Sequence, residues 1–67
     1  MKVRILWDPH TEIKREKQPF NGIYIDFERV PNKFETLTFS GITYIVKTVN
    51  TEIKGWDHFY TVYIDFY

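Results

Sequence analysis

Two short segments place a carboxylate next to an imidazole, the pairing found in metal sites and in acid–base catalysis. They are Trp7-Asp8-Pro9-His10 and Trp56-Asp57-His58. Asp and His are common ligands of divalent metals, and histidine titrates near neutral pH. The two spacings differ, however, and no glycine-rich loop or nucleophile accompanies either segment. We therefore expect no metal site, no cofactor and no catalytic residues, which is typical of a protein that is not an enzyme.

A second group of residues combines cations with aromatic rings. Its cations, Lys14, Arg15, Lys17 and Lys54, come from the polar segments after the first and fourth expected strands, and Trp56 and Tyr60 are the aromatic residues nearby. Small barrels use such surfaces to stack bases and to follow phosphates. Acidic residues are interleaved with these cations, and nine basic and nine acidic residues give the chain no net charge. A solvated loop of mixed charge is the simpler interpretation, so single-stranded nucleic-acid or RNA binding is the alternative hypothesis.

A third group consists of large side chains on the expected outer faces of the strands. It contains Tyr24, Ile45, Tyr63, Asp65 and Tyr67. Contiguous apolar patches on small domains usually mark contact surfaces, and tyrosine is frequent in interfaces. The competing explanation is a barrel so strongly curved that both of its faces are partly buried. The contact hypothesis predicts a protein partner or a homodimer that covers this face or the edge of the C-terminal strand.

Alternating polar and apolar residues predict the five strands that must position these groups. The clearest signal is a hairpin in which Ser40-Gly41 joins two alternating runs and Phe39 faces Ile42. A change of phase near Lys47-Thr48 predicts a β-bulge. The five expected strands are Lys2–Asp8, Ile23–Val30, Phe34–Phe39, Ile42–Val49 and His58–Tyr67, with a long loop over Pro9–Asn21 and a polar link over Asn50–Asp57. The side chains expected in the core are Ile25, Phe27, Phe39, Tyr44, Val46, Ile64 and Phe66.

The length and composition indicate one small β domain, residues 1–67. A chain of 67 residues without cysteine has little core and no disulfides, and its two Trp, five Tyr and six Phe compensate by burying large rings. No apolar run is long enough to span a bilayer, and the first residues do not resemble a signal peptide, so we expect a cytoplasmic protein with no membrane contact.

Two tetrapeptides recur at nearly the same spacing. Thr11–Lys14 recurs as Thr51–Lys54, and Tyr24–Phe27 recurs as Tyr63–Phe66. Residues 1–30 and 41–67 could therefore be related strand–loop–strand units. Convergent strand chemistry is the alternative explanation.

The stretch Val30–Val49, V-P-N-K-F-E-T-L-T-F-S-G-I-T-Y-I-V-K-T-V, resembles a pattern in small SH3-like barrel proteins of phages and mobile elements. That pattern has Val-Pro, a short turn with Gly-Glu, an alternating strand, a Gly turn and then Tyr-x-Val-x-x-Val. At the position of the Gly in that Gly-Glu turn, this chain has Phe34. The resemblance implies a binding module with no catalytic residues, often accessory to phage assembly or host takeover: an inhibitor, adaptor or structural accessory.

The expected fold is therefore all-β, a five-stranded antiparallel SH3-like small barrel. An open antiparallel meander and an OB-like barrel are the alternatives.

The two-residue turn gives a direct test. Gly41→Val should destabilise the protein far more than Ser40→Ala, because a β-branched residue resists the positive φ that such a turn requires. Chemical denaturation of both variants measures the difference. Equal tolerance of the two changes would mean that the turn is longer than two residues.

Overall fold

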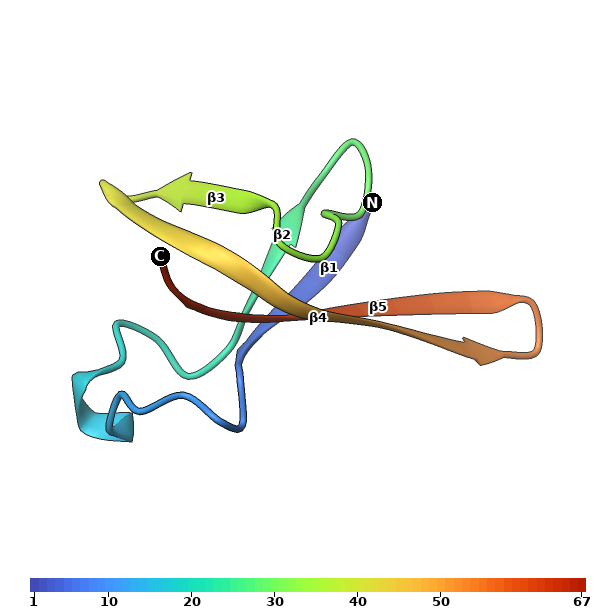
Figure 1. Cartoon of the computed structure of the whole chain (residues 1–67). Helices are drawn as coiled ribbons and strands as arrows, with labels where there is room; N and C mark the ends of the chain where they lie inside the picture. Colours follow the sequence, from blue (N-terminus) through green and yellow to red (C-terminus); the bar gives the residue numbers. More distant parts are fainter.

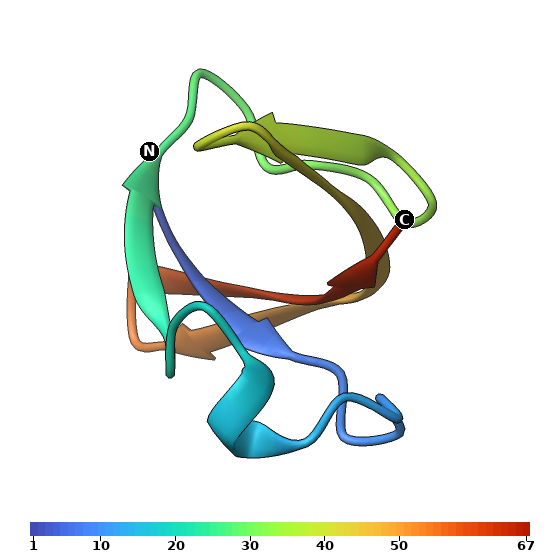
Figure 2. The same cartoon turned by 90° about the vertical axis from the view of Figure 1, so that its left-hand side faces the viewer.

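A single five-stranded sheet makes up most of the chain. The computed structural model describes all 67 residues. Its elements are β1 (Lys2–Trp7), η1 (Arg15–Lys17, one turn of 3-10 helix), β2 (Ile23–Asp26), β3 (Thr36–Phe39), β4 (Ile42–Lys54) and β5 (Asp57–Phe66). The strand order is β2-β1-β5-β4-β3, and the sheet curls into a half-barrel (Figures 1 and 2). The prediction of a small, five-stranded, barrel-like all-β fold is confirmed.

The sheet is mixed, whereas the sequence analysis predicted antiparallel pairing throughout. β1 runs parallel to β5, with Val3 beside Tyr60 and Trp7 beside Ile64, and the other three strand pairs are antiparallel. The reason is one of direction. Each of the four connections reverses the chain, so the first and fifth strands point the same way. Once they become neighbours, they can only be parallel.

The C-terminal strand lies in the middle of the sheet. β4 pairs with β5 from Asp57 to Phe66, and β1 pairs with β5 from Tyr60 to Ile64. Five of the ten residues of β5 therefore have a partner strand on both sides, and β2 and β3 are the outer strands of the sheet. From Tyr60 to Ile64, β5 has no open edge that could pair with a second copy, whereas Asp57–Phe59 pair with β4 alone.

The core forms on the concave face of the sheet, where β1, β4 and β5 meet. Its fully buried members are Val3, Ile5, Tyr44, Val46, Val62 and Ile64. Tyr44, Val46 and Ile64 were predicted correctly. The other predicted side chains, Ile25, Phe27, Phe39 and Phe66, pack against this core but are only partly buried. Ile25 and Phe39 belong to the edge strands β2 and β3, which have a neighbouring strand on one side only.

Four aromatic rings gather around that of Tyr44. Its ring lies 4.5 Å from Phe39, 5.6 Å from Phe66 and 5.8 Å from Trp7, measured between centroids. Phe20, from the long loop after β1, joins them at 6.0 Å from Tyr44. The Trp7 indole Nε1 also donates a hydrogen bond of 2.8 Å to the Phe20 carbonyl oxygen. Phe20 therefore anchors the long loop against this side of the core.

Both tight turns are two residues long. Ser40 and Gly41 have φ of 53° and 77°, the two positive values of a type I′ turn, and Phe39 pairs with Ile42 as predicted. The bulge is also confirmed, because the β4–β5 register shifts between Val46 and Thr48. The polar link predicted after β4 is wrong. β4 runs on to Lys54 and Gly55-Trp56 turns the chain directly into β5.

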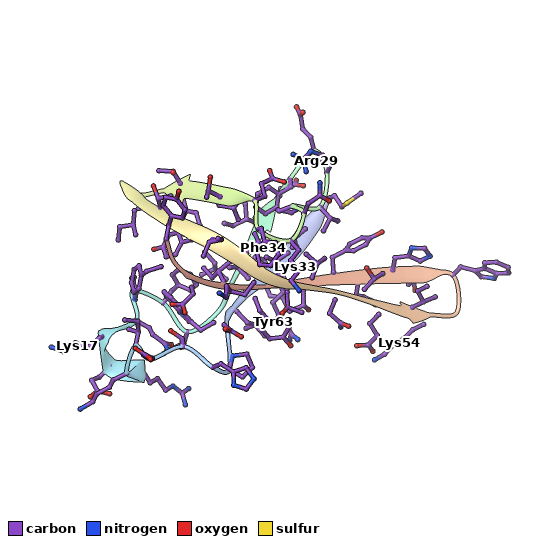
Figure 3. The ribbon with its side chains drawn as sticks, viewed as in Figure 1. Lys17, Arg29, Lys33, Phe34, Lys54 and Tyr63 are labelled. Carbon is purple, nitrogen blue, oxygen red and sulfur yellow. The ribbon has the colours of Figure 1, made fainter.

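The connection between β2 and β3 contains one strained residue. The Asn32 carbonyl oxygen accepts a hydrogen bond from the Glu35 N–H, and Phe34, the third residue of this turn, has φ of 70°. Turns of this type favour glycine at that place, because a Cβ is disfavoured at positive φ. The Phe34 ring is nevertheless 63% exposed, with the Lys33 Nζ 5.0 Å from its centroid (Figure 3).

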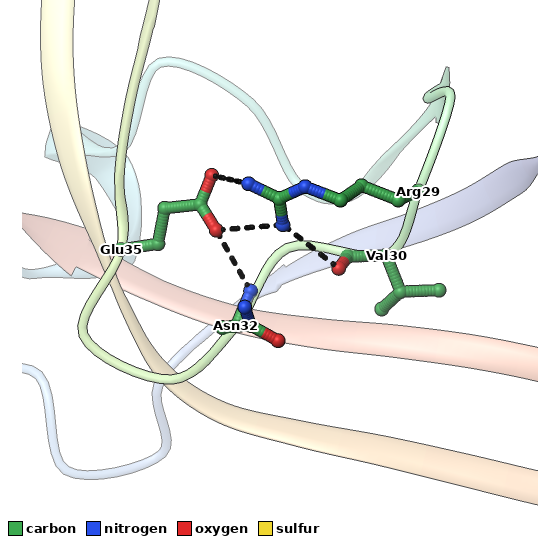
Figure 4. Close-up of polar contacts among 4 residues, drawn as sticks. All are labelled: Arg29, Val30, Asn32 and Glu35. Carbon is green, nitrogen blue, oxygen red and sulfur yellow. Dashed lines mark hydrogen bonds and ion pairs between the residues drawn. The ribbon is translucent and has the colours of Figure 1, made fainter.

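Glu35 links Arg29 and Asn32 within the connection between β2 and β3 (Figure 4). Its two carboxylate oxygens each accept a hydrogen bond of 2.9 Å from Arg29, and one of them also accepts the Asn32 N–H at 3.0 Å. These bonds, that from Arg29 above all, hold the pKa of Glu35 below its usual range. The strained turn at Phe34 is thus fixed by a bidentate ion pair.

Replacing Phe34 with glycine should stabilise the protein. Removing the left-handed strain outweighs the extra chain entropy of glycine, for a net gain of about 1 kcal/mol and a rise in Tm of about 4–8 °C. Thermal unfolding checks this. Phe34→Ala is the matched control, since it removes the ring and keeps the strained Cβ. A gain in the alanine variant equal to that in the glycine variant would show that the ring, and not the backbone, is responsible.

Acid should weaken the protein partly through Glu35. Because folding lowers the pKa of this carboxyl, its contribution is present above the unfolded pKa, near 4.5, and is lost as the pH falls through the lower folded value. Denaturation between pH 7 and pH 3 should therefore show a shallower loss for Glu35→Gln than for wild type. Glu28→Gln, an exposed carboxylate without an ion pair, is the control. An unchanged acid slope in Glu35→Gln would contradict this assignment.

Candidate functional site

The end of β4 and the start of β5 project beyond the half-barrel as a hairpin. We call residues 51–59 the arm; every one of them is exposed. The molecule is 37 Å long but only 21 and 18 Å in its other dimensions, and the arm accounts for this shape (Figure 1). The radius of gyration is 12.0 Å, whereas a compact chain of this length has about 11 Å.

Large apolar side chains are concentrated on the arm. Trp56, at the second place of the turn, is 100% exposed, Ile53 is 62% exposed and Phe59 is 52% exposed. Gly55 has φ of 61° in the first place of the turn, as in a type II′ turn, which leaves the residue type at the second place free. The turn therefore does not explain why a tryptophan stands there.

A groove lies between the base of the arm and the start of β1, and we call it the basal groove. It has a volume of about 630 Å³. Arg4 of β1 is opposite Tyr24 of β2 and beside Thr61 of β5, so these three side chains form one row on the convex face of the sheet. The groove is lined by Met1, Lys2, Arg4, Tyr24, Glu52, Lys54, His58, Phe59, Tyr60 and Thr61.

Two cations of the basal groove form no ion pair, although Lys2 lies opposite Asp26 of β2. Lys54 forms an ion pair with Glu52 at 3.1 Å, and the amino group of Met1 forms one with Asp26. The latter contact lowers the pKa of the Asp26 carboxyl. No ion pair involves Lys2 or Arg4, and the Lys2 Nζ instead lies 5.8 Å from the centroid of the Tyr24 ring.

The residues of the predicted tyrosine surface are only partly together. Tyr63, Asp65 and Tyr67 follow one another on the convex side of β5 and its C-terminal end, and Ile45 of β4 is paired with Asp65. Tyr24 lies on β2, on the far side of β1. Tyr24 and Tyr67 are exposed, while Ile45, Tyr63 and Asp65 are half-buried.

Asp65 already has partners within the chain. Its Oδ1 accepts a hydrogen bond of 2.8 Å from the Thr11 hydroxyl and another from the Phe66 N–H. The carboxylate thus holds the start of the long loop against the sheet.

The predicted loop surface is divided between the two ends of the molecule. Lys17 lies at one end with the η1 loop, which also carries Lys14 and Arg15, and Lys54 lies on the arm at the other end (Figure 3). Tyr60 is half-buried against the core. These cations therefore do not form one surface with Trp56.

The two Asp–His segments are also far apart. The Asp8 N–H donates to the Ile64 carbonyl oxygen, while His58 is six residues earlier on β5, a separation of about 20 Å along an extended strand. No group of three or more His, Cys, Asp or Glu side chains is arranged to hold a metal ion.

Comparison with known proteins adds no assignment. The chain matches no family model, no curated protein and no solved structure. The structure contains no helix of the length and apolar character needed to cross a membrane.

Sequence reasoning missed Lys2, Arg4, Ile53 and Phe59 as parts of a surface. The available signal was Gly55-Trp56, because Gly-X between alternating residues is a hairpin turn. Taking 50–57 as a link hid the arm, and with it the groove at its base.

Proposed function

We propose that this protein is a small binding module that acts by protein–protein contact, as an inhibitor, adaptor or structural accessory, and that the arm is its contact element. The observation that carries the proposal is the fully exposed Trp56 at the arm's turn. Tryptophan is among the residues most enriched at the energetic centres of interfaces. The resemblance of Val30–Val49 to SH3-like phage proteins is in keeping with the same kind of function.

The fold alone gives no reason for an apolar arm. The accessible surface of the chain is 5064 Å², whereas a compact monomer of 8.2 kDa exposes about 4,500 Å². An arm that raises the exposed surface of a small domain lowers its stability per residue unless a partner covers it. Contact with another protein supplies that cover.

The arm's turn and one of its faces supply part of the area that an interface needs. Phe59 shares the face of Glu52 and Lys54 that lines the basal groove, whereas Ile53, paired with His58, lies on the opposite face. Trp56 and Phe59 together expose about 300 Å² of side chain. Standard interfaces bury about 800 Å² on each partner, so these two rings supply over a third of that area and the adjoining basal groove is positioned to supply much of the rest.

Single-stranded nucleic-acid binding by the loop cations has less support. Lys17 lies at the opposite end of the molecule from Lys54 (Figure 3), and Lys14 and Arg15 belong to the same η1 loop as Lys17. A strand-tracking surface needs cations and stacking rings in one continuous path.

The arm can be tested by affinity capture from a lysate of the native host. Wild type should retain at least one protein in moderate salt, and Trp56→Ser should retain at least tenfold less of it, because an interface loses most of its affinity when a central tryptophan is removed. Quantitative mass spectrometry of the bound fraction measures this. Trp56→Ser should change the free energy of unfolding by no more than about 0.5 kcal/mol, as is usual at exposed sites.

The matched control is Tyr67→Ser, which removes another exposed aromatic ring at a distance from the arm. It should leave capture unchanged. Light scattering of purified wild type and Trp56→Ser covers the case in which the partner is a second copy. If no captured protein and no change in mass depends on Trp56, the arm is not the contact element.

A further inference from the structure

The basal groove carries more positive than negative charge. Its four cations are the Met1 amino group, Lys2, Arg4 and Lys54. Two carboxylates face them: Glu52, which pairs with Lys54, and Asp26, which pairs with the Met1 amino group and lies opposite Lys2 on β2. The groove therefore keeps a net excess of two positive charges in a protein of zero net charge.

Lys2 and Arg4 alternate with aromatic rings. Arg4 has Tyr24 directly opposite on β2. On the β5 side, the register that puts Val3 beside Tyr60 continues to place Lys2 beside Phe59. Both rings are more than half exposed. A ligand in the groove can thus pair with a guanidinium and an ammonium while packing its apolar parts on two rings.

We propose that the basal groove binds an acidic segment of a protein partner, with carboxylates on Arg4 and Lys2 and an apolar side chain against Tyr24 and Phe59. The inference rests on the proposed function, since it names the chemistry of the partner that the arm also contacts. The planar fork of Arg4 matches a carboxylate in a bidentate manner, and Lys2 supplies a second positive charge two residues away on the same face.

An acidic peptide fits these observations better than a nucleic acid does. Phosphate-tracking proteins neutralise many charges along the backbone and usually carry a basic excess. The groove has a net excess of only two positive charges, and Glu52 lies on its wall. Two or three carboxylates on a short extended segment satisfy Lys2 and Arg4, whereas a long polyanion meets Glu52, Asp26 and Asp57 nearby.

The test is a selection from a random peptide library displayed on phage, with the full chain immobilised. Enriched peptides should contain at least two Asp or Glu residues beside an aromatic or aliphatic residue. Synthetic copies, followed by fluorescence anisotropy, should bind the Lys2→Glu, Arg4→Glu double variant at least tenfold more weakly. Binding should weaken with added salt, since it includes charge pairs.

The matched control is Lys14→Glu, Lys17→Glu, which makes the same change in net charge in the η1 loop, at the other end of the molecule. It should bind the peptides like wild type. Equal loss in both double variants would show a general charge effect and overturn the groove as the site. Enriched peptides without acidic residues, or no enrichment over the bare support, would overturn it as well.

Two further measurements distinguish an acidic peptide from a nucleic acid and the basal groove from the arm. A 15-nucleotide oligothymidylate that binds more tightly than the selected peptides, and loses binding in Lys2→Glu, Arg4→Glu, would overturn the acidic-peptide proposal in favour of a nucleic acid. Trp56→Ser distinguishes this inference from the proposed function. Peptide binding that survives Trp56→Ser but not Lys2→Glu, Arg4→Glu supports the groove even where the arm fails in affinity capture.

Discussion

The packing of four aromatic rings around Tyr44 is the interaction on which the rest of the structure depends. The rings come from β1, the long loop, β3 and β5, so segments far apart in sequence meet at one side chain. The strand order leaves β2 and β3 as edges that are not bonded to each other. Each aromatic pair adds about 0.5–1.5 kcal/mol to the burial of its area. Because the chain has no cysteine, these contacts supply the stabilisation that disulfides supply in other small domains.

The bulge in β4 separates the two tasks of this strand. Before it, Tyr44 and Val46 are fully buried in the core; after Val49 the strand has only exposed residues and becomes one side of the arm. A single strand of 13 residues thus belongs to the half-barrel at one end and to the candidate contact surface at the other. Because the arm continues a core strand, its base is held rigidly even though its tip contacts nothing within the chain.

Local patterns predicted the hairpin at Ser40-Gly41, the bulge and half of the core, since each depends on residues that are close in sequence. The parallel pairing of β1 with β5 follows from which strands become neighbours, and alternation carries no such information. Phe34 is instructive. Turns of this type favour glycine at the third position, where this chain has Phe34, and the structure gives Phe34 a positive φ. The sequence marked this residue as unusual, and only the structure showed it to be strained and exposed.

The candidate site was harder to predict for a related reason. Lys2, Arg4 and Tyr24 are ordinary outward residues of two strands until the sheet register places Tyr24 opposite Arg4 and Phe59 beside Lys2. Conversely, Lys14, Arg15 and Lys17 form the densest charge in the sequence, yet they lie far from Trp56. Charge density along a chain and charge density on a surface are different quantities.

The parallel pair also determines when the fold can form. β5 occupies the middle of the sheet, yet it is the last of the five strands to leave the ribosome. Until it emerges, β1–β2 and β3–β4 are separate two-stranded units, which are marginal in water on their own. Joining them requires the ends of the chain to meet across about 57 residues, a non-local contact of the kind that slows folding. Cooperative folding therefore cannot begin before β5 has been synthesised, and a chain that stops short of β5 cannot complete the sheet.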